Sequence, residues 1–301
     1  MLFRSVAISP MEGRQLLAYV HIFKAAGTTL TGILRRNFSY RHLDTRLIQE
    51  RPALKAAQLK RAMLLYPRLL SIAGHAVRPH SDLRSNFPGI RFYTFLREPK
   101  ARLVSAFLFL QCYRIRDGRW RPQGAAEIEA RLRRWIVKGR GYCPELAPGG
   151  LAAAIEAIEA QIGFVGLVER FDESLAMLTA WIARPDFDPR YRRLNTVAQR
   201  SEENPSLKDA FARLDETTRA LVERPDIATM IEEACRDDIA LYRHVRGNIF
   251  ERQRQLYRVG PGPFAFETAG IATDTLLGHA HRAFIGRPLA PLLARVPESE
   301  W

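Results

Sequence analysis

The chain has 301 residues, of which 47% are hydrophobic and 26% are charged. This is an ordinary globular composition, long enough to bury a sizeable core. The formal net charge of +14 at pH 7 is not ordinary. It indicates an anionic partner, such as nucleic acid, an acidic polysaccharide, a membrane surface or a phosphorylated cofactor.

The three cysteines, Cys112, Cys143 and Cys235, provide neither a disulfide framework nor a zinc-binding spacing. We expect free buried thiols, and a single Cys112–Cys143 bridge stays open. The amino-terminal stretch lacks the apolar segment of a signal peptide, and no run of about eighteen apolar residues predicts a membrane span. The sequence therefore predicts a soluble, cytoplasmic protein, with peripheral membrane contact left open.

Three apolar segments in the first part of the chain predict strands, and a turn and a helical pattern follow each. The predicted strands are residues 16–23, 69–75 and 90–98. The predicted helices are residues 28–38, 50–66 and 99–116. Three such strand–turn–helix units favour an α/β fold, in which a parallel sheet carries helices on both faces.

The rest of the chain is predicted to be mainly helical around one further strand at residues 162–169. Helices are expected at residues 127–137, 151–161 and 171–182, and Asp172 is a candidate cap of the last. A polar loop follows at 190–206. Beyond it, one apolar stripe at helical spacing comprises Ile231, Cys235, Ile239, Tyr242, Val245 and Ile249. We predict one domain over residues 1–258 and a lightly packed tail over 259–301, with a short helix near 274–284.

The first chemical motif is YVHIFKAAGTTL, residues 19–30. A buried strand leads to Lys24 and Gly27, and two hydroxyl residues, Thr28 and Thr29, then open a helix. Amide groups at a helix start bind anions, and glycine lets the backbone approach them closely. A Walker A motif has its lysine after the last glycine, so this order disfavours a standard nucleoside triphosphatase. The alternative is a tight turn with a solvated lysine.

The second motif is FYTFLREPKARLVSAF, in which Arg97 follows a predicted strand and Ser105 lies eight residues later on a helix. Ligands of open α/β sheets bind beyond the carboxyl ends of the strands, so Arg97 and Lys24 are expected to face one crevice. Arg97 and Ser105 suit a second phosphate group. The alternative is a surface arginine with a structural serine.

Together these motifs resemble the carbohydrate sulfotransferases of the Golgi type. VHIFKAAGTTL is similar to their 5'-phosphosulfate loop, written HIPKTGGTS, and FLREPKARLVSAF to their 3'-phosphate motif, written RDPxxRxxSxY. FVGLVERFDESLAML, RRLNT and RDDIALYRHV resemble landmarks of the branch that contains heparan sulfate 2-O-sulfotransferase. The resemblance extends from about Leu17 to Tyr242.

The resemblance implies a P-loop-like fold, 3'-phosphoadenosine-5'-phosphosulfate (PAPS) as the donor and a sugar hydroxyl as the acceptor. The residues implied for the 5'-phosphosulfate are Lys24, Ala26, Gly27, Thr28 and Thr29. Arg97 and Ser105 are implied for the 3'-phosphate. Two positions depart from the family pattern: Phe23 replaces a proline and Glu98 replaces an aspartate.

Transfer needs a base that takes the proton of the attacking hydroxyl, and histidine is suited to this role near neutral pH. His75 follows a predicted strand and Gly74, and it resembles the Gly-His whose histidine is the base in the 2-O-sulfotransferase branch. His80 and Glu98 are the competitors, while His21 is expected to be packed. The sequence has no metal-ligand spacing, and sulfuryl transfer from PAPS requires no metal.

Two other classes of function are less consistent with the sequence. A small-molecule kinase needs a Walker lysine with a magnesium site. A basic nucleic-acid-binding protein needs aromatic residues among the arginines, and the basic residues 114–140 contain few aromatics. That basic stretch is compatible with an anionic sugar as well as with a solvated face. We therefore expect a carbohydrate acceptor and no nucleic acid, and the oligomeric state is open.

Overall fold

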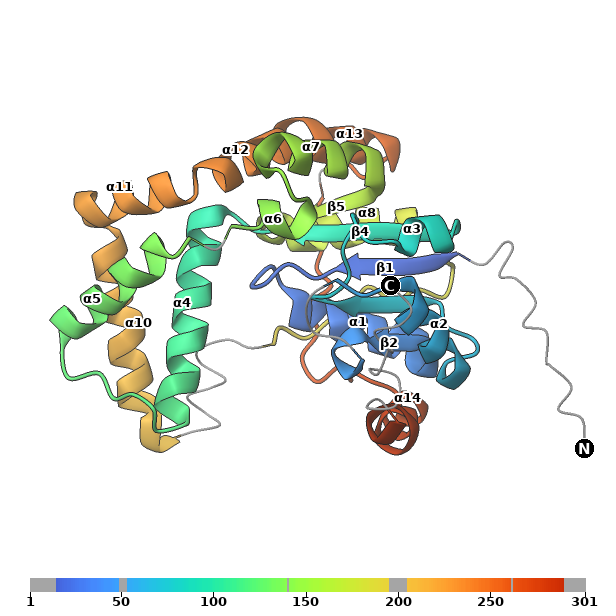
Figure 1. The fold of residues 1–301 in the computed structure, drawn as a ribbon, viewed down its shortest axis with the longest axis horizontal. Coiled ribbons are helices and arrows are strands. Elements are labelled where there is room, and N and C mark those ends of the chain that lie inside the picture. Colours follow the sequence, from blue (N-terminus) through green and yellow to red (C-terminus); the bar gives the residue numbers. More distant parts are fainter. Residues whose placement is uncertain (1–14, 49–52, 140, 195–204, 261, 290–301) are drawn as a thin grey trace, which may run out of the picture.

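The computed structural model describes residues 15–48, 53–139, 141–194, 205–260 and 262–289. Within these residues, five parallel strands form one sheet in the order β2-β3-β1-β4-β5 (Figure 1). Their bounds are β1 Leu16–Val20, β2 His42–Asp44, β3 Ser71–Gly74, β4 Ile90–Leu96 and β5 Ile162–Leu167. The predicted α/β class with a parallel sheet is confirmed.

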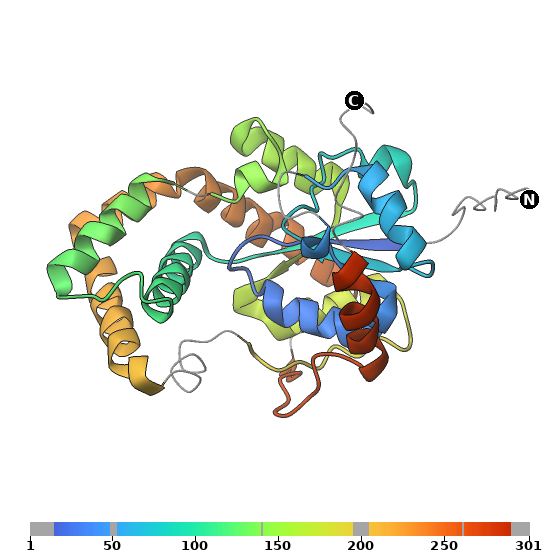
Figure 2. The same cartoon turned by 60° about the horizontal axis from the view of Figure 1, so that its bottom comes forward.

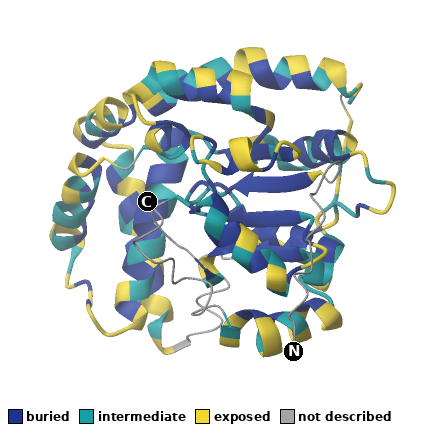
Figure 3. Ribbon diagram, turned by 45° about the vertical axis from the view of Figure 1, so that its right-hand side comes forward, coloured by how far each residue is buried: buried dark blue, intermediate teal, exposed yellow. Residues whose placement is uncertain are grey.

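The central strand β1 is buried along its whole length, and Figure 3 shows the same for most of the sheet. Parallel strands covered on both faces need a continuous apolar run, which LLAYV supplies. The strand is shorter than predicted, because the chain turns after Val20. There the amide of Ile22 donates to the Val20 carbonyl at 3.1 Å, and His21–Phe23 belong to the following loop.

Helices cover both faces of the sheet, as Figure 2 shows. Helices α1 (Gly27–Phe38) and α8 (Phe171–Ile182) lie on one face. Helices α2 (Ala56–Leu65), α3 (Leu83–Asn86) and α7 (Gly150–Gln161) lie on the other. This arrangement follows from the strand order, because the chain moves outward from β1 to β2 and then returns across the sheet to β4.

A helical lobe projects beside the sheet, at the left of Figure 1. It consists of α4 (Pro99–Arg116), α5 (Ala125–Val137), α10 (Lys208–Val222) and α11 (Pro225–Ala234). These helices have their own hydrophobic core, which includes Phe107, Ile128, Leu132, Phe211, Leu214 and Ile227. The lobe therefore has a packing centre apart from the core around the sheet.

The predicted apolar stripe connects these two cores. The helix breaks at Cys235, between α11 and α12 (Arg236–His244), and then continues through Val245–Ile249 into α13 (Phe250–Leu256). Ile231 and Cys235 belong to the core of the lobe, whereas Tyr242 and Val245 belong to the core of the sheet. One pattern in the sequence thus contributes to two packing centres.

Two local predictions are wrong. Asp172 lies in the first turn of α8 and not at its cap, which is Arg170, because its carboxylate instead accepts the amide of Phe266 at 3.1 Å. The helix expected from residue 50 begins at Ala56, since residues 53–55 are extended or irregular and residues 49–52 lie outside the described part.

All three cysteines are free and buried.

The described part of the tail folds back onto the first half of the chain. Helix α14 (Leu276–His281) continues into a π-helical turn at Arg282–Gly286. The Ser39 and Thr275 hydroxyls lie 2.6 Å apart. The ring of His281 packs on the ring of Tyr66, with 4.5 Å between the ring centroids. The proposed boundary at residue 258 stays a prediction. No helix among the described residues is long and apolar enough to cross a membrane.

Candidate active site

Three adjacent strands of the sheet end in the residues that carry the predicted chemistry. The loop with Lys24 follows β1, His75 follows β3 directly, and Arg97 follows β4 directly. Since β3, β1 and β4 are neighbours and parallel, their carboxyl ends lie at one edge of the sheet. This edge is where open α/β sheets bind their ligands.

The loop after β1 leads into α1 through two residues with an unusual backbone conformation. Lys24 (φ 66°) and Ala26 (φ 58°) both have left-handed backbone conformations, and Gly27 begins the helix. The amide of Leu30 donates to the Ala26 carbonyl at 3.1 Å. The amides of the three preceding residues therefore belong to the first turn, whose N–H groups have no acceptor within the helix and favour anions.

The two threonines of the loop differ in their surroundings. Thr28 is exposed, whereas Thr29 is buried, and the Thr29 hydroxyl accepts the amide of Leu194 at 3.4 Å. Thr28 is thus the hydroxyl that faces outward at the helix start. Leu194 comes from the predicted RRLNT landmark, of which Asn195 and Thr196 lie outside the described residues.

Glycine at position 27 is required by the packing of His21. A Cβ atom at this position would overlap the His21 ring. That ring stacks on His75 with 4.1 Å between the ring centroids. Burial, and next the neighbouring His75, lower the pKa of His21 well below its usual 6.5. His21 is therefore a neutral packing partner of His75 at pH 7, in line with the expectation that it is packed.

His75 is held in one orientation by the loop beside it. Its Nδ1 lies 2.8 Å from the carbonyl oxygen of His21, so Nδ1 carries the proton and donates it to that oxygen. In the neutral ring Nε2 then has the lone pair. His80 is exposed, with its Nδ1 3.2 Å from the Leu146 carbonyl, and it stands six residues beyond the end of β3.

Phe23, the residue that replaces the family's proline, packs between the two sides of the site. Its ring lies 6.0 Å from the His75 ring and 5.5 Å from the Phe109 ring. The Lys24 ammonium lies 4.1 Å from the centroid of Phe109. Ser105 is on α4 one turn before Phe109, so it shares the helix face that meets Lys24.

Arg97 is half-buried at the start of α4. Burial lowers its pKa, and the carboxylates of Glu169 and Glu98 oppose that change. Glu98 caps α4, since its carboxylate accepts the amides of Lys100 at 3.1 Å and Ala101 at 2.7 Å. Pro99 occupies the first turn, as predicted. The acidic residue after Arg97 thus orders the helix that carries Ser105.

Two residues of this corner were not predicted as part of the site. Glu169, just after β5, accepts the Glu98 amide at 2.9 Å and the Tyr242 hydroxyl at 2.7 Å. Both lie in segments that resemble family landmarks, FVGLVER and RDDIALYRHV. Those segments were the available signal, but only the fold shows that they meet behind Arg97.

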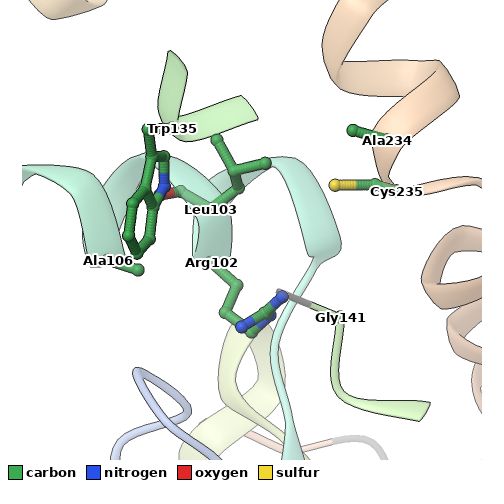
Figure 4. Close-up of a pocket in the computed structure, with 7 residues that line it drawn as sticks. All are labelled: Arg102, Leu103, Ala106, Trp135, Gly141, Ala234 and Cys235. Atoms are coloured by element: carbon green, nitrogen blue, oxygen red, sulfur yellow. The ribbon is translucent and has the colours of Figure 1, made fainter. Parts of the chain in front are cut away.

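A small cavity lies in the neighbouring lobe, beside Arg102 on α4 (Figure 4). Its volume of about 10 Å³ is that of one water molecule and excludes a substrate. Arg102 is itself buried and pairs with Asp238 at 3.2 Å. This cavity belongs to the packing of the lobe and not to the active site.

The described part of the basic stretch, residues 114–139, also belongs to the lobe. Arg131 pairs with Glu127, and Arg133 pairs with both Glu129 and Asp226. Part of this positive charge is therefore balanced within the protein. Among the residues that the structure describes, no group of three His, Cys, Asp or Glu side chains is placed to hold a metal ion.

Comparison with known families gives one match, to the sulfotransferase family, over residues 10–140. No curated protein and no solved structure matches this chain. The matched residues include the loop after β1, the end of β3, and the arginine after β4 with its helix. The family implies PAPS as the sulfuryl donor, and the start of α1 with Lys24 is compatible with such an anionic donor. The chain is therefore an enzyme whose residues 10–140 match the sulfotransferase family.

Proposed function

We propose that this sulfotransferase moves the sulfuryl group of PAPS to a hydroxyl of a carbohydrate, with His75 as the general base. The observation that carries the proposal is the meeting of three strand ends, which places Lys24, His75 and Arg97 at one edge of the sheet. The orientation of His75 and the resemblance to the 2-O-sulfotransferase branch support the choice of base.

The donor is proposed to lie across the ends of β1 and β4. The amides at the start of α1, with Lys24, would hold the 5'-phosphosulfate. The half-buried Arg97, with Ser105 on the next helix, would hold the 3'-phosphate. Lys24 would stabilise the negative charge that grows on the leaving phosphate oxygen as the sulfur–oxygen bond breaks.

The acceptor hydroxyl is proposed to lose its proton to Nε2 of His75 while its oxygen forms the new bond to sulfur. The bond between sulfur and the donor phosphate breaks, and adenosine 3',5'-bisphosphate leaves. The His75 ring can take this proton because its Nδ1 is already committed to the His21 carbonyl. Glu98 is less suited to be the base, since both of its carboxylate oxygens accept amides of α4.

A thermal-shift comparison of two nucleotides tests the donor. Adenosine 3',5'-bisphosphate should raise the melting temperature, because a ligand at 100 times its Kd stabilises the native state by about 2.7 kcal/mol. ATP, which lacks the 3'-phosphate, should do so far less. Arg97→Ala should remove most of the difference, whereas Arg219→Ala, on the far lobe, should not. Equal shifts with both nucleotides would favour the kinase alternative.

A further inference from the structure

A cavity of about 410 Å³ lies at the carboxyl end of β2, away from the residues assigned to the donor. It is enclosed by α1, by the turn after β2 and by the C-terminal helical segment. Its lining residues are Arg35, Asp44, Arg46, Leu47, Asp274, His279, Arg282, Ala283 and Arg287. The C-terminal segment thus closes a cavity whose other wall comes from the first fifty residues.

The lining carries more positive than negative charge, with four arginines against two aspartates. Each aspartate is already paired. Asp44 accepts Nε of Arg35 at 3.0 Å, and Asp274 pairs with Arg282. Arg46 and Arg287 are exposed, and neither has a carboxylate partner within the part of the chain that the structure describes. The cavity is therefore suited to an anion.

Arg282 gives an independent indication of a ligand. The residue is only 7% exposed, and its Nη1 has no hydrogen-bond partner among the described residues. A buried donor without an acceptor costs free energy, and the cost is larger for a charged group. Burial first, and then the nearby Arg35, lower the pKa of Arg282. Arg282 also lines the cavity, so an oxyanion bound there would offset the repulsion between Arg282 and Arg35.

The cavity adjoins the edge that carries His75. In the register of β2 and β3, Asp44 lies beside Ala73. Arg46 lies two residues after Asp44, and His75 lies two residues after Ala73. The segments that carry Arg46 and His75 therefore leave neighbouring strands, which are about 4.8 Å apart. Thr45 packs against Gly74 so closely that a side chain at Gly74 would overlap its hydroxyl.

We propose that this cavity binds an anionic group of the acceptor, a carboxylate or a sulfate, while a nearby hydroxyl of the same molecule reaches His75. The inference rests on the proposed function and adds a substrate class to it. The sheet order separates the two anion sites. Arg97 stands after β4 on one side of β1, and the cavity lies at β2 on the other side. The donor and an acidic acceptor would thus approach the central strand from opposite sides.

Calorimetry with inorganic sulfate tests the cavity itself. The protein is first saturated with adenosine 3',5'-bisphosphate, so that the donor site is filled, and the ionic strength is held constant with chloride. Sulfate should bind the wild type, and Arg287→Gln should weaken that binding roughly tenfold. The matched control is Arg219→Gln, because Arg219 lies on α10 in the helical lobe. This variant should bind sulfate like the wild type. Absent binding, or equal binding by Arg287→Gln, would overturn the proposal.

Kinetics distinguish the acceptor from a free anion. The acceptors are a disaccharide with glucuronic acid and its counterpart with glucose, in which a hydroxymethyl group replaces the carboxylate. The ratio of their kcat/KM values should favour the acid, and Arg287→Gln should lower that ratio about tenfold. If sulfate binds but the ratio does not change, the cavity holds free anions and the acceptor assignment is wrong.

The proposed function and the anion site can be tested independently of each other. If the nucleotide does not stabilise the protein, the donor assignment is lost. Sulfate titration of Lys24→Ala, in which the donor loop is weakened, still tests the cavity, because Lys24 does not line it. Binding that Arg287→Gln then weakens roughly tenfold would support the anion site, and binding that it leaves intact would refute it.

Discussion

Lys24 and Ala26 hold backbone conformations that residues with a Cβ atom rarely adopt. Ala26 stands where the resembling motif HIPKTGGTS has its first glycine. A left-handed conformation costs an alanine about 1 kcal/mol or more relative to glycine. This strain lies at the start of the helix assigned to the donor, which is where folded proteins tend to retain it.

Replacing Ala26 with glycine should therefore stabilise the protein. We expect Ala26→Gly to raise the free energy of unfolding by about 1 kcal/mol, measured by urea denaturation. The matched control is Ala25→Gly in the same loop. Ala25 is fully buried and has no positive φ, so this change should destabilise the protein. If both variants were destabilised alike, the strain at Ala26 would not be real.

The assignment of the base also belongs to the residue scale. His75→Ala should lower kcat by about 10²-fold or more under saturating donor, because no other group takes the hydroxyl proton. Donor affinity should change little, since the ring is assigned to the acceptor. His80→Ala should have a much milder effect, because His80 is exposed beyond the strand end.

Steady-state rates of His75→Ala and His80→Ala are best compared with Glu98→Gln. If His75→Ala were near wild type and Glu98→Gln inactive, the base would be a carboxylate. Glu98→Gln can still accept one helix amide, so loss of fold does not explain an inactive variant. Circular dichroism of all three variants checks this.

From the sequence, candidate site residues could be proposed where a reactive side chain directly follows an apolar run, as at His75 and Arg97. Glu169 and Tyr242 were not assigned, because their role is to hold Glu98 and its helix in place. Such a role depends on which segments meet in space, and neither residue type nor spacing encodes it.

At the scale of elements, long patterns were predicted well and short ones were not. Helix α4 and strand β4 agree with the prediction closely. Strand β2 was missed because it has only three residues, two of them His42 and Asp44. Those polar side chains are buried because they have partners: His42 Nδ1 lies 3.0 Å from the Ser71 hydroxyl, and Asp44 pairs with Arg35.

One buried ion pair joins the lobe to the helices around the sheet. Asp238 on α12 is 3% exposed, and it pairs with Arg102 on α4 at 3.2 Å. Its carboxylate also accepts the amide of Tyr142 at 3.0 Å. Removal of one partner leaves the other charge buried without compensation, a costly change in a protein interior.

We therefore expect Asp238→Ala to destabilise the protein by about 3–5 kcal/mol, measured by urea unfolding. Glu232→Ala is the control. Glu232 on α11 pairs with Lys100 on α4, but both side chains are exposed. The unfolding midpoint of Glu232→Ala should therefore not move measurably. A wild-type midpoint for Asp238→Ala would show that the pair does not join these elements.

At the scale of the whole molecule, the net charge predicted an anionic partner, but the sequence did not predict where on the protein that partner would bind. Residues 114–139 of the basic stretch lie in the lobe and are partly neutralised by carboxylates. The larger cationic cavity instead combines Arg35 and Arg46 with Arg282 and Arg287 from the tail. Residues more than two hundred positions apart come together there, and no local pattern in the sequence could have indicated it.

The strand order also determines when the chain can fold during its synthesis. Of the five strands β1 is made first, but its two neighbours are β3 and β4. Residues 16–20 therefore have no partner until residues 71–74 leave the ribosome, and no second partner until residues 90–96 do. At about 5–20 residues per second this interval lasts several seconds. During that time the most apolar strand is exposed in the nascent chain. The interval between β1 and β3 is thus the period in which the nascent chain most needs a chaperone, and nascent chains that stop before β3 should be retained by one.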